Sequence, residues 1–273
     1  MISPLPGSSS GLKHARASRG RGLPEGLAPV CVETVFTAMF AATNRVAPAR
    51  ENPPIVLVHG LVIAGAYLYP LAALLAPKAR VYVPDLPGYG FSAASHTLSV
   101  AGLADALAAF LDARGIVRAQ CVGNSFGCQV LAEFALRHPG RVDRLVLQGL
   151  TVDPEARSAR AQLIRLVRNT PYEAPSLGRL TIRDYRRAGL MRALKVARFA
   201  LADRVEDKLP AITAPTLLVR GDKDPLMPEV WAERARDLLP DARLTVIAGG
   251  HAVHYTAPYR MMGAIAAFLG LSA

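Results

Sequence analysis

A serine, an aspartate and a histidine occur in an order that suits nucleophilic catalysis: Ser125, Asp224 and His251. A serine hydroxyl is a poor nucleophile unless a base takes its proton during attack, and a neutral imidazole suits that task near pH 7. The second imidazole nitrogen needs a carboxylate partner, which fixes the tautomer and stabilises the imidazolium. These residue types therefore predict acyl transfer through a covalent serine intermediate.

Ser125 lies in the pentapeptide Gly-Asn-Ser-Phe-Gly (residues 123–127), which we expect to form a sharp turn. An apolar strand is predicted before it, over 118–122, and apolar residues recur at helical spacing after it as far as His138. Strand, G-x-S-x-G and helix in this order form the nucleophile-elbow signature. Glycine is required at both ends, because a side chain there would collide with the neighbouring strand and helix.

The pentapeptide pattern alone is weak, because residues 7–11 (Gly-Ser-Ser-Ser-Gly) also fit it. That second copy has no strand before it and no helix after it. The structural context therefore selects Ser125 as the nucleophile.

Strands alternate with helices along the chain, which predicts an α/β fold with a doubly wound, mostly parallel sheet. We expect one or two strands over 30–43 and further strands at 55–58, 81–83, 118–122, 142–147, 216–219 and 244–247. Helices are expected at 66–75, 99–113, 126–138, 229–239 and 258–269. Residues just after parallel strands meet at one crevice. The stretches 59–61, 125–126, 222–224 and 249–251 should therefore meet there.

Three kinds of segment are expected along the chain. Residues 28–151 and 209–273 should form the core, and 152–208, which has Arg-rich helical stretches and no convincing strand, should form a helical cap or lid. Residues 1–27 are predicted to be a disordered basic extension. Their basic start leads into Ser, Gly and Pro instead of an apolar segment, so no secretory signal is predicted and a cytoplasmic location is expected.

The net charge of +11 is concentrated outside the predicted core. Residues 1–24 carry four Lys/Arg and no acid, and 152–208 carry thirteen Lys/Arg against seven Asp/Glu. No aromatic-interleaved basic patch or recognition helix is found, so nucleic acid is not an expected partner. Residues 54–77 lack charged side chains, but His-Gly, Gly and Pro interrupt them, so no membrane span is predicted.

These motifs resemble those of the α/β-hydrolase superfamily, from about Val30 to the end of the chain. The stretches that carry the resemblance are 59–60, 85–92, 123–127, 221–228 and 250–251. The order serine, acid, histidine is that of the superfamily. The resemblance favours Asp224 over Asp222, because in relatives the acid usually lies four residues before the proline. It also implies a helical cap that forms the substrate pocket.

Backbone donors for an oxyanion hole are expected at Phe126, directly after the nucleophile, and at Leu61. By resemblance, the His-Gly turn at 59–60 shapes that hole. Five further residues are candidates to line the substrate pocket, with core packing as the alternative for each: Tyr67, Tyr172, Tyr185, Met191 and Phe199.

Rival interpretations of the site remain. Asp222 is the alternative acid or a turn-capping residue, and His254 competes with His251 as the base. These two histidines and His59 could suggest metal ligands, but no carboxylate or cysteine spacing supports a zinc site. We therefore expect neither metal nor cofactor.

Serine at the elbow disfavours epoxide hydrolase and haloalkane dehalogenase chemistry, which in this superfamily needs an aspartate there. The leading expectation is a serine hydrolase that cleaves a small-molecule carboxylic ester or lactone. The elbow also resembles that of meta-cleavage-product hydrolases, which split carbon–carbon bonds in vinylogous diketo acids. Against this alternative, Ala252 stands where those enzymes usually have Trp, and Cys128 stands where a second glycine is usual. A perhydrolase, or a receptor-like ligand-binding protein with slow turnover, are further alternatives.

Overall fold

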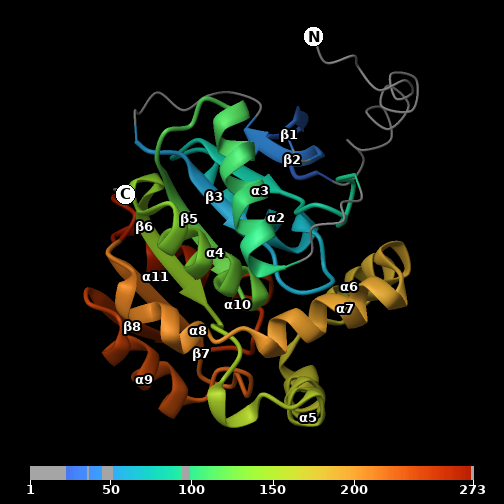
Figure 1. Cartoon of the computed structure of the whole chain (residues 1–273), viewed down its shortest axis with the longest axis vertical. Coiled ribbons are helices and arrows are strands. Elements are labelled where there is room, and N and C mark those ends of the chain that lie inside the picture. Colours follow the sequence, from blue (N-terminus) through green and yellow to red (C-terminus); the bar gives the residue numbers. More distant parts are fainter. Residues whose placement is uncertain (1–22, 36, 45–51, 94–98, 272–273) are drawn as a thin grey trace.

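An eight-stranded sheet runs through the protein in the order β1-β2-β4-β3-β5-β6-β7-β8 (Figure 1). The computed structural model describes residues 23–35, 37–44, 52–93 and 99–271, so residues 1–22 of the predicted N-terminal extension lie outside the described part. The strands are β1 (Leu27–Glu33), β2 (Ala38–Asn44), β3 (Ile55–Val58), β4 (Val81–Pro84), β5 (Ala119–Asn124), β6 (Val142–Gln148), β7 (Thr216–Gly221) and β8 (Ala242–Ile247).

The sheet is antiparallel at one edge and parallel elsewhere. Strand β2 pairs antiparallel with both β1 and β4, whereas every pair from β4 to β8 is parallel. Strand β5 pairs with β3 on the side opposite β4, so the strand order reverses there. The predicted doubly wound, mostly parallel α/β sheet is confirmed, and the predicted nucleophile follows the strand at this reversal.

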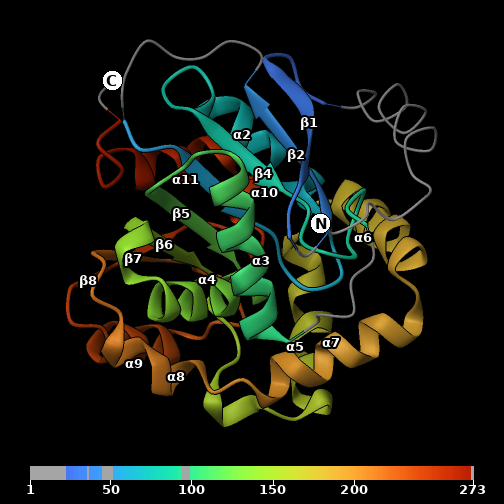
Figure 2. The same ribbon diagram turned by 45° about the horizontal axis from the view of Figure 1, so that its top comes forward.

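Helices cover both faces of the sheet (Figures 1 and 2). One face packs against α3 (Val100–Ala113), α4 (Phe126–Arg137) and α9 (Glu229–Leu238), and the other against α2 (Tyr69–Leu75), α10 (Val253–Thr256) and α11 (Pro258–Ala266). In β3, alternate residues enter the two apolar clusters, because successive side chains of a strand point to opposite faces. All four are buried, as expected for a continuous apolar run inside a parallel sheet.

Element boundaries differ slightly from the expected ones. The first core helix begins with a 3-10 turn, η1 (Gly65–Leu68), before α2. Pro70 lies in the first turn of α2, where its missing N–H costs no intrahelical hydrogen bond. Strand β5 extends to Asn124, so the sharp turn starts directly at the serine.

Residues 152–208, between β6 and β7, form an insert that is entirely described and contains no strand. It comprises η3 (Pro154–Ala156), α5 (Ala159–Asn169), η4 (Thr170–Tyr172), α6 (Pro175–Ala188), α7 (Leu190–Ala202) and α8 (Val205–Lys208), and η5 (Leu209–Ala211) follows. Helices α5, α6 and α7 project at the lower right of Figure 1. Arg165 of α5 pairs with the buried Asp153 at 2.6 Å, which fixes this helix to the start of the insert.

Residues 54–77 contain β3, a loop, η1 and α2, as their interrupting glycines and proline predicted. Across the described residues, no helix has both the length and the apolar character needed to cross a bilayer.

Candidate active site

Ser125 lies at the junction of β5 and α4 with φ 56° and ψ −121°. Non-glycine residues rarely adopt this region, so surrounding contacts must hold the turn. The Ser125 N–H donates to the Gln148 carbonyl at 3.0 Å, and its own carbonyl accepts from the Cys128 N–H at 2.9 Å. The backbone thus presents the serine on a fixed, sharp turn.

The glycines that flank the turn are sterically required. A Cβ atom on Gly127 would lie 2.4 Å from the Val58 carbonyl oxygen and 2.7 Å from that of His59. On Gly123, it would lie 3.0 Å from the Cys128 backbone nitrogen. The first contact would separate α4 from β3, and the second would force the turn away from α4.

Asp224 and His251 are hydrogen bonded in the core of the site. Asp224 Oδ2 lies 2.8 Å from His251 Nδ1, and both residues are buried. The other oxygen, Oδ1, accepts from the backbone N–H groups of Leu226 at 2.8 Å and Met227 at 3.3 Å. The carboxylate is therefore oriented by its own turn and faces the imidazole.

Asp222, the rival carboxylate, has a different environment. Its side chain is 41% exposed, and its Oδ1 accepts from the Gly249 N–H at 2.8 Å. It therefore braces the loop that precedes His251 and does not contact the imidazole.

The surroundings of His251 determine its proton affinity. Burial alone would lower its pKa, but the charge and hydrogen bond of Asp224 and the charge of Glu173 outweigh this and raise it above the ordinary value. Its other nitrogen, Nε2, is buried and has no hydrogen-bond partner among the described residues, so no Ser125–His251 hydrogen bond is formed. The Asn124 side chain, one residue before the serine, nevertheless donates to the His251 carbonyl at 3.3 Å.

The loop after β3 lies against the serine. A Cβ atom on Gly60 would be 3.3 Å from Ser125 Cβ, which brings Leu61 to the same turn as Phe126. Within the described chain, neither the Leu61 nor the Phe126 N–H donates to another group. Val62 has φ 60°, a strained value for a β-branched residue, and is buried.

The other two histidines of the region are buried and have structural partners. His59 Nδ1 donates to the Gly60 carbonyl at 2.9 Å and Nε2 accepts from the Leu86 N–H at 2.9 Å, while burial lowers its pKa to about 4. His254 Nδ1 donates to Gln148 Oε1 at 2.7 Å, and burial lowers its pKa to about 3. No cluster of three possible metal ligands occurs in the described part of the chain.

Tyr67 lies beneath the serine turn, 3% exposed, and does not line an open pocket. Its hydroxyl accepts from the Gly60 N–H at 2.6 Å and donates to Asn124 Oδ1 at 2.7 Å. Asn124 Nδ2 donates to Gln148 Oε1 at 2.6 Å, and Gln148 Nε2 donates to the His251 carbonyl at 2.7 Å. This buried chain of hydrogen bonds connects the loop after β3, the serine turn and the histidine loop.

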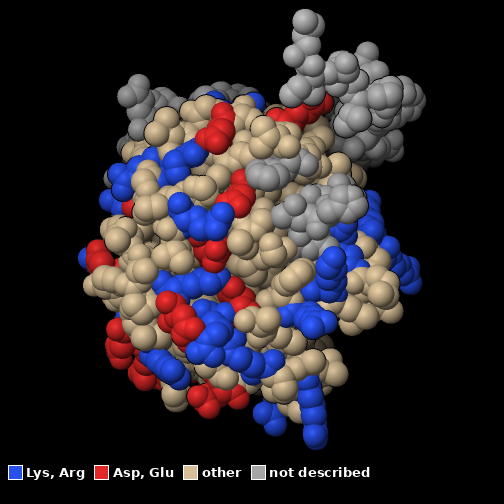
Figure 3. Space-filling model, viewed as in Figure 1, with Lys and Arg blue, Asp and Glu red and all other residues tan. Residues whose placement is uncertain are grey.

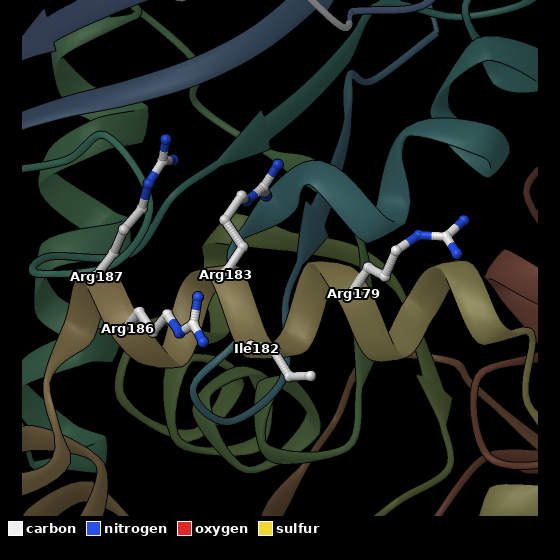
Figure 4. A pocket seen from close by; sticks show the side chains of 5 residues that line it. All are labelled: Arg179, Ile182, Arg183, Arg186 and Arg187. Atoms are coloured by element: carbon white, nitrogen blue, oxygen red, sulfur yellow. The ribbon is translucent and has the colours of Figure 1, made fainter.

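The remaining candidate pocket residues are scattered over the insert. Tyr172, Tyr185 and Met191 are 47%, 43% and 79% exposed, which excludes core packing for them, whereas Phe199 packs against the core. Tyr172 is close to the histidine loop, because a Cβ atom on Gly250 would lie 2.9 Å from its Cβ. A shallow hollow elsewhere, on α6, is lined mainly by arginines (Figure 4).

Comparisons with known proteins identify relatives of the chain. A family model described as alpha/beta hydrolase fold matches residues 53–183. The putative carbamate hydrolase RutD of Caulobacter sp. is 28% identical over 247 residues, 81% of this chain and 92% of that protein. Esterase YbfF of Escherichia coli is 28% identical over 242 residues, 81% and 94% of the two chains. The 2-hydroxy-6-oxo-2,4-heptadienoate hydrolase of Pseudomonas putida is 42% identical over 101 residues, only 35% and 37% of the two chains.

Proposed function

Since the chain belongs to the α/β-hydrolase fold superfamily and is a hydrolase, we propose that it cleaves a carboxylic ester or lactone through an acyl-enzyme on Ser125. The observation that carries this proposal is the buried Asp224–His251 hydrogen bond beside a serine held on a strained turn. A buried imidazole with one nitrogen bound to a carboxylate has its other nitrogen available for the serine proton. Esterase YbfF, similar over most of its length, supports the ester class.

In the proposed mechanism, His251 Nε2 accepts the Ser125 hydroxyl proton as Oγ attacks the substrate carbonyl carbon. The carbonyl oxygen becomes an oxyanion, which the N–H groups of Leu61 and Phe126 receive. Collapse of this tetrahedral intermediate restores the carbonyl and breaks the bond between the acyl carbon and the leaving alkoxy oxygen, which the imidazolium protonates. Water then attacks the acyl carbon and gives a proton to His251. The bond between the acyl carbon and Ser125 Oγ breaks, and the imidazolium returns the proton to Oγ, which releases the acid and free Ser125. Asp224 retains its charge throughout.

The insert is the proposed cap over this site, on a core made of 28–151 and 209–273. Its support is the contact of η4 with the histidine loop, where Tyr172 meets Gly250. We assign Tyr172 to the substrate pocket first, and Tyr185, Met191 and Phe199 only through their position on the insert.

A fluorophosphonate probe tests the proposed nucleophile. The wild-type protein should be labelled on Ser125, and Ser125→Ala should not be labelled. A panel of p-nitrophenyl esters of graded acyl length and of lactones then defines the substrate. Equal labelling of the two proteins, or labelling at another residue, would refute the assignment of Ser125.

Carbon–carbon hydrolysis of a vinylogous diketo acid is the second candidate. The local 42% identity to the Pseudomonas putida hydrolase favours it, as does the basic insert for an anionic substrate. Ala252, where such enzymes usually carry Trp, is buried next to His251. Turnover of a ring-cleavage dienoate faster than any ester would establish this candidate in place of the first.

A further inference from the structure

The insert is hydrogen bonded directly to the loop that carries the proposed base. Asn169, the last residue of α5, is buried, and its Oδ1 accepts from the His251 N–H at 3.0 Å. Glu173 Oε1 accepts from the Ala252 N–H at 2.8 Å and from Asn169 Nδ2 at 2.8 Å. Two consecutive backbone donors of the histidine loop are therefore bound by two side chains of the insert.

The histidine peptide is held from both sides. A Cβ atom on Gly250 would lie 2.8 Å from Glu173 Oε1 and 3.0 Å from Asn169 Oδ1, so the insert lies directly on the loop backbone. From the core side, Gln148 Nε2 donates to the His251 carbonyl at 2.7 Å. The insert thus binds the His251 N–H, and the core binds the His251 carbonyl.

We propose that Asn169 and Glu173 are positioning residues for His251, so that the insert helps to orient the base as well as to cover the substrate. This inference rests on the proposed role of His251 as the base. It adds that the rate of attack by Ser125 depends on a contact between two separate parts of the chain. Neither side chain needs to touch the substrate for this role.

The charge of Glu173 also acts on the base. Three ionisable groups face His251: Asp224 on the turn after β7, Glu173 on the insert, and His254 on α10, which burial keeps neutral. The base must be neutral to act, so kcat/KM falls as pH decreases through the pKa of His251. Both carboxylates stabilise the imidazolium and raise that pKa. Loss of the Glu173 charge should therefore shift the acid limb of the plot of kcat/KM against pH, where activity falls as the base is protonated, to lower pH.

Three variants test the positioning role. Asn169→Ala leaves the His251 N–H without its acceptor, and should lower kcat and the rate of fluorophosphonate labelling by about tenfold or more, with KM little changed. Glu173→Gln keeps an acceptor oxygen but removes the charge, and should lower the midpoint of the acid limb. Glu155→Gln removes a charge from an exposed part of the insert and is the matched control, with no change expected in either quantity.

Two readouts separate this inference from the proposed function. The pKa of the His251 ring, followed by NMR, should be lower in Glu173→Gln than in wild type whether or not any substrate is turned over. Labelling of wild-type Ser125 tests the nucleophile alone. If Asn169→Ala and Glu173→Gln behave like Glu155→Gln in labelling rate, pH midpoint and ring pKa, the positioning role is refuted.

The outer surface of the insert carries an independent signal. Ten of the sixteen exposed large apolar side chains of the described residues belong to the insert, including the three proposed pocket residues Tyr172, Tyr185 and Met191. On α5 all four large aliphatic residues are exposed, by 41% to 63%, namely Leu163, Ile164, Leu166 and Val167. The polar Asn169 and Arg165 face the protein instead. The helix therefore presents an apolar surface outward, which in proteins marks an interaction site.

Arginines lie on the next long helix of the insert, α6. Along α6, four of them line a shallow hollow together with the exposed Ile182: Arg179, Arg183, Arg186 and Arg187 (Figure 4). Arg183 pairs with Asp184, and the Arg187 guanidinium lies 4.7 Å from the centroid of the Phe91 ring, so both face the protein. Neither Arg179 nor Arg186 has an ion-pair partner among the described residues. Lys and Arg side chains also gather over the insert at the lower right of Figure 3.

The combination of aliphatic and cationic side chains identifies the partner. A second copy of the chain would bring two inserts of like charge together, and a nucleic acid would match the arginines but not the aliphatic groups. An anionic bilayer accepts both, with arginines at the headgroups and aliphatic side chains at the acyl boundary. We infer that the outer surface of the insert docks on anionic lipid without spanning the bilayer.

Vesicle sedimentation tests the docking surface. The protein should sediment with vesicles of phosphatidylcholine and phosphatidylglycerol but not with phosphatidylcholine alone, and added salt should release it. Arg179→Gln/Arg186→Gln and Leu163→Gln/Val167→Gln should each weaken this binding at least fivefold. Val117→Gln, at a 78% exposed site outside the insert, is the control. Equal binding of all variants, stronger binding to RNA, or dimerisation through Leu163 and Val167 would overturn the inference.

Discussion

Two aspartates of one turn can be compared directly at the residue scale. Asp224 contacts the imidazole and Asp222 braces the preceding loop, although only one residue separates them. We expect Asp224→Asn to lower kcat/KM by about 10²- to 10⁴-fold, because the amide no longer stabilises the imidazolium. Asp222→Asn should keep near-normal turnover. Ester hydrolysis assays measure both, and the reverse order of effects would mean that Asp222 is the functional acid.

The Tyr67 hydroxyl should contribute to stability through the buried network. Tyr67→Phe leaves the Gly60 N–H and Asn124 Oδ1 without partners, which should lower the free energy of unfolding by about 1–3 kcal/mol. Tyr69→Phe removes a hydroxyl that has no hydrogen bond in the described structure, and serves as the control. Urea unfolding measures both variants, and equal loss in the two would show that the network adds no stability.

Residue types alone revealed the serine, the two aspartates and the histidines, because their chemistry and spacing are distinctive. Gln148 and Asn169 could not be recognised in this way. Gln148 ends an apolar strand and Asn169 ends an Arg-rich helix, where a polar side chain is ordinarily solvated. Their roles depend on facing inward, and that direction is set by tertiary packing.

At the scale of elements, the contact between β3 and α4 can be tested at one atom. Gly127→Ala places a methyl group 2.4 Å from the Val58 carbonyl oxygen. Neither the backbone of α4 nor that of β3 can move away without a large cost in free energy. We expect a loss of about 3 kcal/mol in the free energy of unfolding, together with slower labelling of Ser125. In Gly263→Ala, in α11, the added methyl group meets no neighbouring atom within 4 Å. This variant should instead gain about 0.5–1 kcal/mol in the free energy of unfolding. Thermal unfolding that ranks the two equally would contradict this steric account.

The helices of the insert show what periodicity can and cannot predict. Their spacing indicates helices, and 152–208 is helical without a strand. The pattern does not say which face is buried, and on α5 the aliphatic face is the outer one because Arg165 and Asn169 bind polar groups inside. Three of the candidate pocket residues, Tyr172, Tyr185 and Met191, lie on exposed faces of the insert, and which of them contact the substrate stays a prediction.

For the whole molecule, the alternation of strands and helices was sufficient to predict the parallel sheet, because each βαβ unit has one preferred hand. It was not sufficient to predict that β2 pairs with β4, since a strand's neighbour depends on contacts between segments about forty residues apart. Turns that follow parallel strands lie at the same edge of the sheet, so the positions of Ser125, Asp224 and His251 could be predicted from the topology. The positions of the pocket residues could not, because they lie on the insert, outside the sheet.

Buried groups with shifted pKa values should make the stability of the whole molecule depend on pH. Burial lowers the pKa of His59 from 6.5 to about 4, so the unfolded chain binds a proton there that the folded protein excludes. Stability is therefore lost as pH falls from 6.5 towards 4, by about 3 kcal/mol for this group. Asp85 acts oppositely, since burial raises its pKa from 3.8 to about 6 and the folded protein gains a proton first.

The contribution of His59 can be isolated with His59→Gln, whose amide can still accept from the Leu86 N–H and donate to the Gly60 carbonyl. Asp85 is present in both proteins, so its effect cancels when their unfolding free energies are subtracted. The advantage of wild type over the variant should shrink by about 3 kcal/mol between pH 7 and pH 4. Urea unfolding at a series of pH values measures this difference. A difference that does not change with pH would show that His59 is not held neutral in the folded protein.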